Sequence, residues 1–366
     1  MEPTRKPEEQ AVFALRELYR SRGYRPYKMS RFEAYDLYVE NKDFLQSDRV
    51  ITFSDRGGRL LAMKPDVTLS IIKNAPDHPG QVRKVYYNEN VYRADSGIQG
   101  FREILQTGLE CVGDLGAYEI AEVALLAARS LALLGSGFVL NLSHMGFVWA
   151  VLDNSGLSAS GRKEALGFLR QKNSHELLGL CRRENIGEPG TAKLLALIRE
   201  DGNAGTVCAA LLPLLDSGRE RELLEELSRV CRILTGSGFG GNIRLDFSVG
   251  NEMKYYSGLV FKGYLEGIPV SVLSGGQYDR LLRKMGRASR AIGFAINLNL
   301  LETRNPREEV DILLLHDPSE PAENVMAAVE SLPGSVLAAT ELPPEGTFQR
   351  IAKLGKEGIQ WLNPEC

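Results

Sequence analysis

The sequence is poor in the residues that build covalent or metal-bound frameworks. Its five cysteines are an odd number among 366 residues, and none lies in a Cys-x-x-Cys pair. This usage argues against a disulfide framework and against a zinc site, and it fits a reducing compartment. The first ten residues, MEPTRKPEEQ, have no apolar segment behind them, so we expect no signal peptide and a cytoplasmic protein.

Long hydrophobic runs and a strong charge of one sign are also absent. The most apolar stretch, residues 122–140, is interrupted by Glu122 and Arg129, which predicts a core helix and no membrane span. The formal net charge is −3 and the pI is about 6.0, so the composition gives no sign of a broad nucleic-acid-binding surface. Hydrophobic residues make up 43% of the chain and charged residues 25%, as in ordinary soluble globular proteins.

The distribution of helix-type and strand-type patterns predicts an α+β protein with two parts. Strands and amphipathic helices are indicated through residues 1–305, and leucine- and alanine-rich segments with helical spacing interrupt them at about 147–237. We therefore predict a β-rich core with a helical insertion. Residues 308–366 are predicted to form a small C-terminal βαβαβ unit, with TFQRIAKLGKEG (347–358) as its second helix.

Residues 83–113 predict two strands joined by a polar loop. Side chains alternate between the two faces of a strand, so the returning strand has an apolar face, which we assign to the core, and a polar face. The apolar face consists of Phe101, Leu105, Leu109 and Cys111, and the other face of Arg102, Ile104, Gln106, Gly108 and Glu110. A glycine in the middle of a strand often marks the close approach of a ligand or of another backbone. The second face therefore predicts the floor of a polar pocket, with a solvent-facing strand as the alternative.

A second group of polar residues follows a predicted hairpin in residues 49–68. The second strand of this hairpin ends at Pro65, which lacks the N–H that a ladder needs, and Asp66 and Thr68 follow directly. Because a helix is predicted from Thr68 onward, Asp66 fits an N-cap. Acids and hydroxyls at the ends of strands also commonly face a cleft, so both interpretations of Asp66 stay open.

Five segments, in this order along the chain, resemble the motifs of the class II aminoacyl-tRNA synthetases, and specifically of the histidyl-tRNA synthetases. They are MKPDVT (63–68), VYRADSGIQGFREILQTGLE (91–110), KYYSGLVF (254–261), SGGQYDRLL (274–282) and AIGFAI (291–296). The third and fourth are similar to the histidine-specific motifs Asp-Tyr-Tyr-x-x-x-Val-Phe and Gly-Gly-Arg-Tyr-Asp. The resemblance covers about residues 8–302, and it implies an antiparallel sheet flanked by helices, with a helical insertion.

The resemblance also implies a histidine-binding site. Asp66 would bind the α-amino group, and Thr68 and Gln106 would add hydrogen bonds. Glu110 and Tyr256, with the preceding tyrosine nearby, would hold the imidazole, because an imidazole N–H needs a fixed acceptor and an ammonium needs a carboxylate. Plain packing against the sheet is the alternative for the two tyrosines. The implied site residues are Asp66, Thr68, Arg93, Gln106, Glu110, Tyr255 and Tyr256.

The departures from the synthetase motifs concern the cations that adenylation needs. Arg93 keeps the arginine of the second motif, but Ala94-Asp95-Ser96 replaces the His-Glu-Arg-Pro run that follows it in the synthetases. Leu300 stands where the third motif ends in arginine, and Asn251 where an arginine serves the carboxylate of histidine, which leaves Arg93 or Arg102 for that role. Removing one such electrostatic stabiliser costs about 10²–10³ in rate, so we expect negligible adenylation. The tail is also shorter than a complete anticodon-binding domain.

This combination is similar to the histidyl-tRNA synthetase-like regulatory subunits of ATP phosphoribosyltransferase, the first enzyme of histidine biosynthesis. The resemblance implies a catalytically silent subunit that binds L-histidine, activates a short-form catalytic subunit and transmits feedback inhibition. It also implies a homodimer within a hetero-oligomer, although Ser30 departs from the proline of the first class motif near the dimer interface. No cofactor, metal, nucleic acid or membrane is implied. The alternatives are an active histidyl-tRNA synthetase and a stand-alone histidine-binding or RNA-modifying paralogue.

Overall fold

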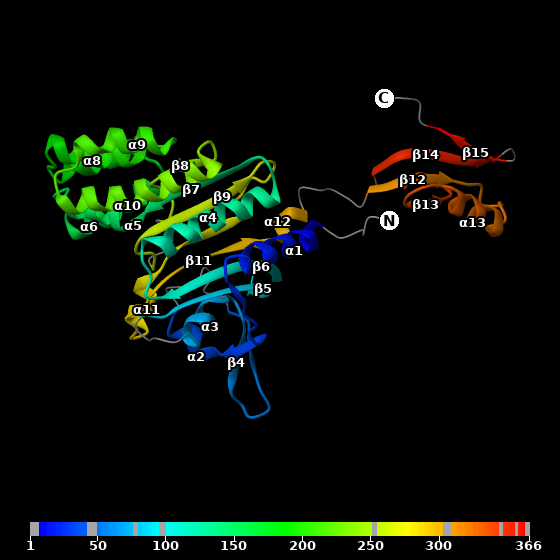
Figure 1. The fold of residues 1–366 in the computed structure, drawn as a ribbon, viewed down its shortest axis with the longest axis horizontal. Helices are drawn as coiled ribbons and strands as arrows, with labels where there is room; N and C mark the ends of the chain where they lie inside the picture. Colours follow the sequence, from blue (N-terminus) through cyan, green and yellow to red (C-terminus); the bar gives the residue numbers. More distant parts are fainter. Residues whose placement is uncertain are drawn as a thin grey trace. The chain divides into compact units, whose positions relative to one another are not determined.

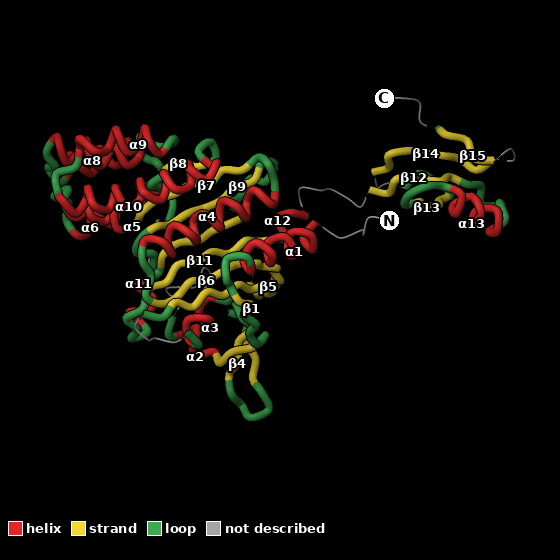
Figure 2. Tube along the Cα trace, in the orientation of Figure 1, coloured by secondary structure: helices red, strands yellow, loops and turns green. Residues whose placement is uncertain are grey.

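The computed structural model divides the chain into two compact units, Met1–Leu301 and Glu302–Cys366, and each is described by itself. The predicted α+β class is confirmed, because helices pack on a large, mainly antiparallel sheet (Figures 1 and 2). The residues that the structure describes are 7–41, 50–75, 80–94, 100–250, 255–302, 309–343, 347–355 and 358–362.

An eight-stranded sheet forms the centre of the first unit, and its strands have the order β1-β5-β6-β11-β10-β9-β7-β8. Neighbouring strands are antiparallel except in the pairs β1–β5 and β7–β8. The strands are β1 (Arg25–Pro26), β5 (Val82–Ala94), β6 (Phe101–Gly113), β7 (Phe138–His144), β8 (Ile243–Leu245), β9 (Leu259–Leu265), β10 (Leu273–Gln277) and β11 (Arg290–Asn297).

The two faces of this sheet have different surroundings. On the first face, Leu109 and Cys111 of β6 belong to the main apolar core together with residues of α1 (Pro7–Arg20) and α4 (Ala117–Leu134). Since the pleat directs alternate residues to opposite sides, Glu110 of β6 lies on the second face. The strands pair residue by residue from β6 across β11 to β10, so this face is continuous over the three strands.

A small three-stranded sheet, β2-β4-β3, packs with short helices on the second face. The predicted hairpin is present as β3 and β4, and its turn is fixed by Asp55, whose Oδ1 accepts hydrogen bonds from the backbone N–H groups of Gly57 and Arg59. The elements are β2 (Phe32–Ala34), α2 (Tyr35–Val39), β3 (Thr52–Ser54), β4 (Leu60–Met63), α3 (Thr68–Lys73) and α11 (Asp279–Lys284).

Six helices follow β7 and precede β8, in the region where the sequence predicts the helical insertion (Figure 1). Several begin at the side-chain caps that helix N-termini favour: Ser158 accepts a hydrogen bond from the Gly161 N–H, and Ser217 forms a capping box with Glu220. The helices are α5 (Met145–Asp153), α6 (Ala159–Arg170), α7 (Ser174–Arg183), α8 (Glu188–Arg199), α9 (Ala204–Leu211) and α10 (Gly218–Leu234).

One residue assigned to the core from the sequence is exposed. Phe101 is 74% exposed, although Leu109 and Cys111 on the same face of β6 are fully buried. The reason is the length of the neighbouring strand, since β11 pairs with Gln106–Gly113 only. The first residues of β6 extend beyond this partner, so the apolar side of Phe101 has no cover from β11.

The second unit has a four-stranded sheet with the order β13-β12-β14-β15. The predicted second helix is wrong, because residues 347–355 form a strand that pairs with β12 on one side and with β15 on the other. Two ladders of backbone hydrogen bonds and the burial of Ala352 outweigh the weak helical spacing of this segment. The elements are β12 (Glu309–Leu315), α13 (Ala322–Ser331), β13 (Val336–Ala339), β14 (Thr347–Gly355) and β15 (Gly358–Trp361).

Candidate functional site

Glu110 is the centre of a buried polar cluster on the second face of the sheet, and it is only 2% exposed. The hydroxyl of Thr68 donates to Oε1 of Glu110 at 2.7 Å, and the hydroxyl of Tyr278 donates to Oε2. Its neighbour on β11 is Gly293, where a Cβ atom would lie 1.8 Å from Oε2. Glycine at this position therefore leaves the carboxylate the space it occupies.

The electrostatic environment of Glu110 is unfavourable for a charged carboxylate. Burial raises the pKa of Glu110 to about 8, although the hydroxyls of Tyr278 and Thr68 lower it and Asp66 raises it further. No lysine, arginine or histidine in the described part of the chain forms an ion pair with this group. A carboxyl group kept in such surroundings is characteristic of a functional site, because a ligand can supply the missing positive charge or N–H donor.

Asp66 and Thr68 reach the cluster from the start of α3. Oδ1 of Asp66 accepts a hydrogen bond from the backbone N–H of Leu69 at 3.0 Å, so Asp66 satisfies a donor in the first turn of α3, but the N-cap residue is Val67 and the N-cap prediction is wrong by one position. Burial raises the pKa of Asp66, while the backbone N–H groups and the charge of Arg93 lower it. Arg93 also donates from Nε to the carbonyl of Pro65 at 3.3 Å. Asp66 therefore bonds to the first turn of α3 and also lies beside the polar cluster.

Gly108 is explained by close packing within the protein. It pairs with Tyr87 of β5, and a Cβ atom at 108 would lie 2.5 Å from the Tyr87 hydroxyl oxygen and 2.4 Å from the carbonyl oxygen of Phe294. Gln106 lies two pairs further along the ladder, on the same face, and is 9% exposed. A solvent-facing strand is therefore wrong for residues 106–110, and the polar residues of this segment are buried.

The tyrosines of the KYYSGLVF segment precede β9, and their ring centroids are 4.5 Å apart. Tyr256 is 6% exposed and packs on Gly276 of β10, where a Cβ atom would lie 2.8 Å from its Cε1. Burial raises the pKa of Tyr256, and the carboxyl groups of Glu110 and Asp66 act in the same direction. Tyr255 has the same two carboxyl groups in its electrostatic surroundings. Both rings thus belong to the neighbourhood of the cluster.

The structure brings six of the seven predicted site residues into one electrostatic neighbourhood on the second face, and Gln106 shares the strand face of Glu110. Two further residues were not assigned from the sequence. Tyr278 lies in the SGGQYDRLL segment, which was identified as a motif, but the motif alone predicted no contact for its hydroxyl. Tyr87 could be found only from its pairing with Gly108, which a single sequence does not give. The six are Asp66, Thr68, Arg93, Glu110, Tyr255 and Tyr256.

The positions that depart from the synthetase motifs are only partly described. Asn251, Asp95 and Ser96 lie outside the described residues. In α12 (Asn299–Glu302), Oδ1 of Asn299 accepts the backbone N–H of Leu105 at 2.6 Å, and Leu300 packs against the main core. These two residues connect α12 to β6 and the core.

Two other kinds of site, a metal centre and a membrane span, have no counterpart in the part of the chain that the structure describes. There, no three His, Cys, Asp or Glu side chains gather in a way that could hold a metal ion. No helix within the same ranges has the length and apolar character needed to cross a membrane.

Comparison with known families establishes the relationship of the chain. Residues 2–301 match the family model described as Histidyl-tRNA synthetase. The chain belongs to this family. Among curated proteins, it is 29% identical over 309 residues to the ATP phosphoribosyltransferase regulatory subunit of Clostridium novyi, covering 81% of this chain and 72% of that protein. It is 29% identical over 289 residues to the protein of the same name from Alkaliphilus metalliredigens, covering 77% and 72%.

Solved structures agree on the fold. A protein from Bacillus halodurans described as an ATP phosphoribosyltransferase regulatory subunit/histidyl-tRNA synthetase is similar with a TM-score of 0.72 at 23% identity, covering 95% of this chain and 93% of that one. A chain of the ATP phosphoribosyl transferase complex from Thermotoga maritima is similar with a TM-score of 0.63 at 19% identity, covering 80% and 97%. The resemblance that the motifs indicated, to the regulatory subunits within this family, is confirmed.

Proposed function

We propose that this protein is a non-catalytic regulatory subunit of ATP phosphoribosyltransferase, in the first step of histidine biosynthesis. It binds histidine at the Glu110 cluster, activates the short catalytic subunit and transmits feedback inhibition to it. The observation that carries the ligand part of this proposal is the buried Glu110 carboxyl, which two hydroxyls orient and no described cation neutralises. The names of the curated relatives support the regulatory part.

Histidine has the groups that this cluster lacks. Its imidazole N–H is a donor for the Glu110 carboxylate, and its α-ammonium group is a partner for Asp66, whose pKa is also raised by burial. Arg93, beside Asp66, is the cation that we assign to the ligand carboxylate. Gln106, Thr68 and the two tyrosines before β9 complete the site. Binding would favour ionised Glu110, because the ligand returns the polar contacts that burial removed.

The partner is proposed from the relatives. The Thermotoga maritima structure is described as a complex of ATP phosphoribosyl transferase, and this chain resembles a subunit of it over 97% of that subunit's length. Feedback requires histidine to favour one arrangement of the complex, since a ligand shifts an equilibrium only through differential affinity. We propose that the protein acts as a homodimer within such a hetero-oligomer in the cytoplasm.

The regulatory role is tested by measuring ATP phosphoribosyltransferase activity of the short catalytic subunit alone and with this protein. We expect activity to rise on addition of this protein and histidine to inhibit the pair more strongly than the catalytic subunit alone. A catalytic subunit that is equally active and equally histidine-sensitive by itself would contradict the proposal.

The histidine site is tested separately by calorimetry. We expect Glu110→Ala to lower the affinity for histidine by about 10- to 100-fold, because a hydrogen bond to a charged group contributes about 1.5–3 kcal/mol. Glu103→Ala is the matched control, since Glu103 is an exposed acid on the same strand whose partners are Asn90 and Tyr92. Equal affinity in both variants would remove Glu110 from the site.

An active synthetase is the alternative that the family relationship makes concrete. Histidine-dependent exchange of pyrophosphate into ATP distinguishes the two functions. We expect no exchange above background, because Leu300 and Asn299 have structural contacts where the synthetase motif supplies an acid and an arginine. Exchange at a rate typical of synthetases would replace the regulatory proposal.

A further inference from the structure

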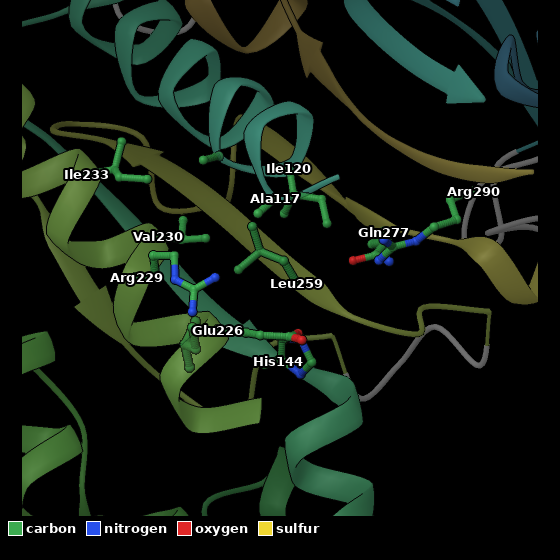
Figure 3. Close-up of a pocket in the computed structure, with 12 residues that line it drawn as sticks. Ala117, Ile120, His144, Glu226, Arg229, Val230, Ile233, Leu259, Gln277 and Arg290 are labelled. Carbon is green, nitrogen blue, oxygen red and sulfur yellow. The ribbon is translucent and has the colours of Figure 1, made fainter. Parts of the chain in front are cut away.

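A cavity of about 110 Å³ lies on the first face of the sheet, between α4 and α10 (Figure 3). Residues from both helices and from the ends of β7, β9, β10 and β11 line it. It is separate from the Glu110 cluster, because the side chains of successive residues here point to opposite faces of the sheet. Gln277 lines the cavity, whereas the next residue, Tyr278, donates its hydroxyl to Glu110.

Most of the cavity lining is apolar, but three basic residues reach it. Arg290 already has partners, because its Nε lies 3.3 Å from Oδ2 of Asp279 and its Nη1 donates to the carbonyl of Leu115 at 2.7 Å. Arg229, on α10, forms no hydrogen bond or ion pair with any residue of the described ranges. Arg229 is exposed, and it is the cation at this cavity without a hydrogen-bonded partner among the described residues, although its charge also lowers the pKa of nearby Glu225.

His144 contributes a buried N–H donor beside Arg229. It is 6% exposed, and its Nδ1 accepts the backbone N–H of Phe147 at 3.1 Å. The neutral ring therefore has its proton on Nε2, which lies 3.5 Å from Oε2 of Glu226. Figure 3 shows His144, Glu226 and Arg229 on neighbouring sides of the pocket, with Ile120 and Leu259 nearby. Glu226 is half exposed at its side chain, so it can turn toward solvent when another carboxylate takes its place.

We propose that this cavity binds a small monocarboxylate with a short apolar chain. Arg229 and the Nε2–H of His144 hold the carboxylate, and Ile120, Leu259 and Ile233 contact the chain. The volume of about 110 Å³ equals that of about four liquid water molecules, so only a small ligand fits. A doubly charged anion such as phosphate fits less well, because Glu226 repels it and the one free-standing arginine, Arg229, already lies near Glu225.

The test uses the full chain with methyl-labelled isoleucine, and it follows the Ile120 and Ile233 signals by NMR. Addition of butyrate is expected to shift both signals in a saturable way. The signal of Ile71, which lies in a separate core cluster with Tyr87, is expected to stay in place. Butyramide, which has the same shape without the charge, and inorganic phosphate are expected to cause no saturable shift. Equal effects of butyrate and butyramide, a saturable effect of phosphate, or no effect of butyrate would overturn the proposal.

Three variants separate this site from unspecific binding. Arg229→Ala is expected to weaken butyrate binding about tenfold or more, because it removes a charge-assisted hydrogen bond. Glu226→Gln is expected to strengthen binding several-fold, since it removes the repelling charge and frees the His144 donor. Arg232→Ala removes the same charge from the same helix outside the cavity, where Arg232 pairs with Glu225, and is expected to bind as wild type. Wild-type affinity in Arg229→Ala, or weaker binding in Glu226→Gln, contradicts the assignment.

Discussion

Two glutamates in different regions, Glu110 in the sheet and Glu220 in the helical insertion, are both almost completely removed from solvent. In the insertion, Nζ of Lys193 lies 3.2 Å from Oε1 of Glu220, and the backbone N–H groups of Asp216 and Ser217 donate to Oε2. In the sheet, Glu110 has only the hydroxyls of Thr68 and Tyr278 as described hydrogen-bond donors. One buried acid has its counter-charge within the fold, and the other does not.

The comparison of Glu220 with Glu110 distinguishes a buried charge that stabilises the fold from one that can bind a ligand. Lys193, Glu220 and the capping box of α10 satisfy one another, so the group needs nothing from outside. Burial disfavours the ionised form of the Glu110 carboxyl. The neighbouring position on β11 is a glycine, Gly293, which leaves space beside this carboxyl. The first arrangement stabilises a helical module, whereas the second is available for a ligand with a positive charge or an N–H donor.

The largest expected effect comes from removing the cation that pairs with Glu220, so that this acid, like Glu110, is buried without a counter-charge. Lys193→Met keeps the length of the side chain but leaves Glu220 buried without its cation, so the free energy of unfolding should fall by about 3–5 kcal/mol. Urea denaturation followed by circular dichroism measures this. Arg219→Met, which removes an exposed ion pair with Glu222, should stay close to wild type. Similar values for the two variants would mean that the buried pair has no special role.

A smaller effect tests the uncompensated acid in the sheet. The folded pKa of Glu110, about 8, is higher than its ordinary value of 4.5, so the folded protein keeps a proton that the unfolded chain loses between these pH values. Wild-type stability should therefore decline as pH rises through this window, and Glu110→Gln should lack that part of the decline. The gap in unfolding free energy should widen in favour of the variant from pH 5 to pH 8, by a few kcal/mol at most. A constant gap would contradict the raised pKa, and Glu103→Gln is the control.

The smallest effect concerns the hydroxyl that Tyr278 gives to Glu110. Tyr278→Phe removes a donor to a buried acceptor and should lower the free energy of unfolding by about 1–2 kcal/mol, more at pH 9 than at pH 6, because the hydroxyl favours the ionised carboxylate. Tyr38→Phe is the matched control: Tyr38 is 1% exposed, and its hydroxyl has no hydrogen-bond partner among the described residues. If thermal denaturation at both pH values gives equal losses for the two variants, the contact with Glu110 contributes nothing.

The sequence predicted the elements around the site well where the alternation of side chains between the two faces of a strand agreed with their burial. The assignment of Gln106, Gly108 and Glu110 to one face of a strand needed only the period of two, and the buried polar face agrees with it. The place of Asp66 at the start of α3 followed from the proline before it and the helix after it, although the N-cap residue itself is Val67. In each case the local rule and the tertiary environment favoured the same structure.

The predictions that were wrong or missing depended on partners distant in sequence. Phe101 is exposed because β11 stops short of it, and the helix predicted over residues 347–355 is a strand because β12 and β15 lie on both sides of it. The bond from Tyr278 to Glu110 spans 168 positions, and no local pattern announces it. Strand length and pairing are set by the whole sheet, so short windows of one sequence do not contain them.

Three glycines on adjacent strands surround Glu110: Gly108, Gly293 and Gly276. At each of them, other protein atoms lie within 3 Å of the place where a Cβ atom would be. Even one added methyl group at any of these positions would therefore force its surroundings to move. A single added methyl group at Gly293 acts on the carboxylate, and one at Gly276 acts on the ring of Tyr256. A Cβ atom at any of the three would also lie within 2.8 Å of a backbone carbonyl oxygen, so the same glycines that leave space for the acid and the ring are needed for the close approach of the backbone.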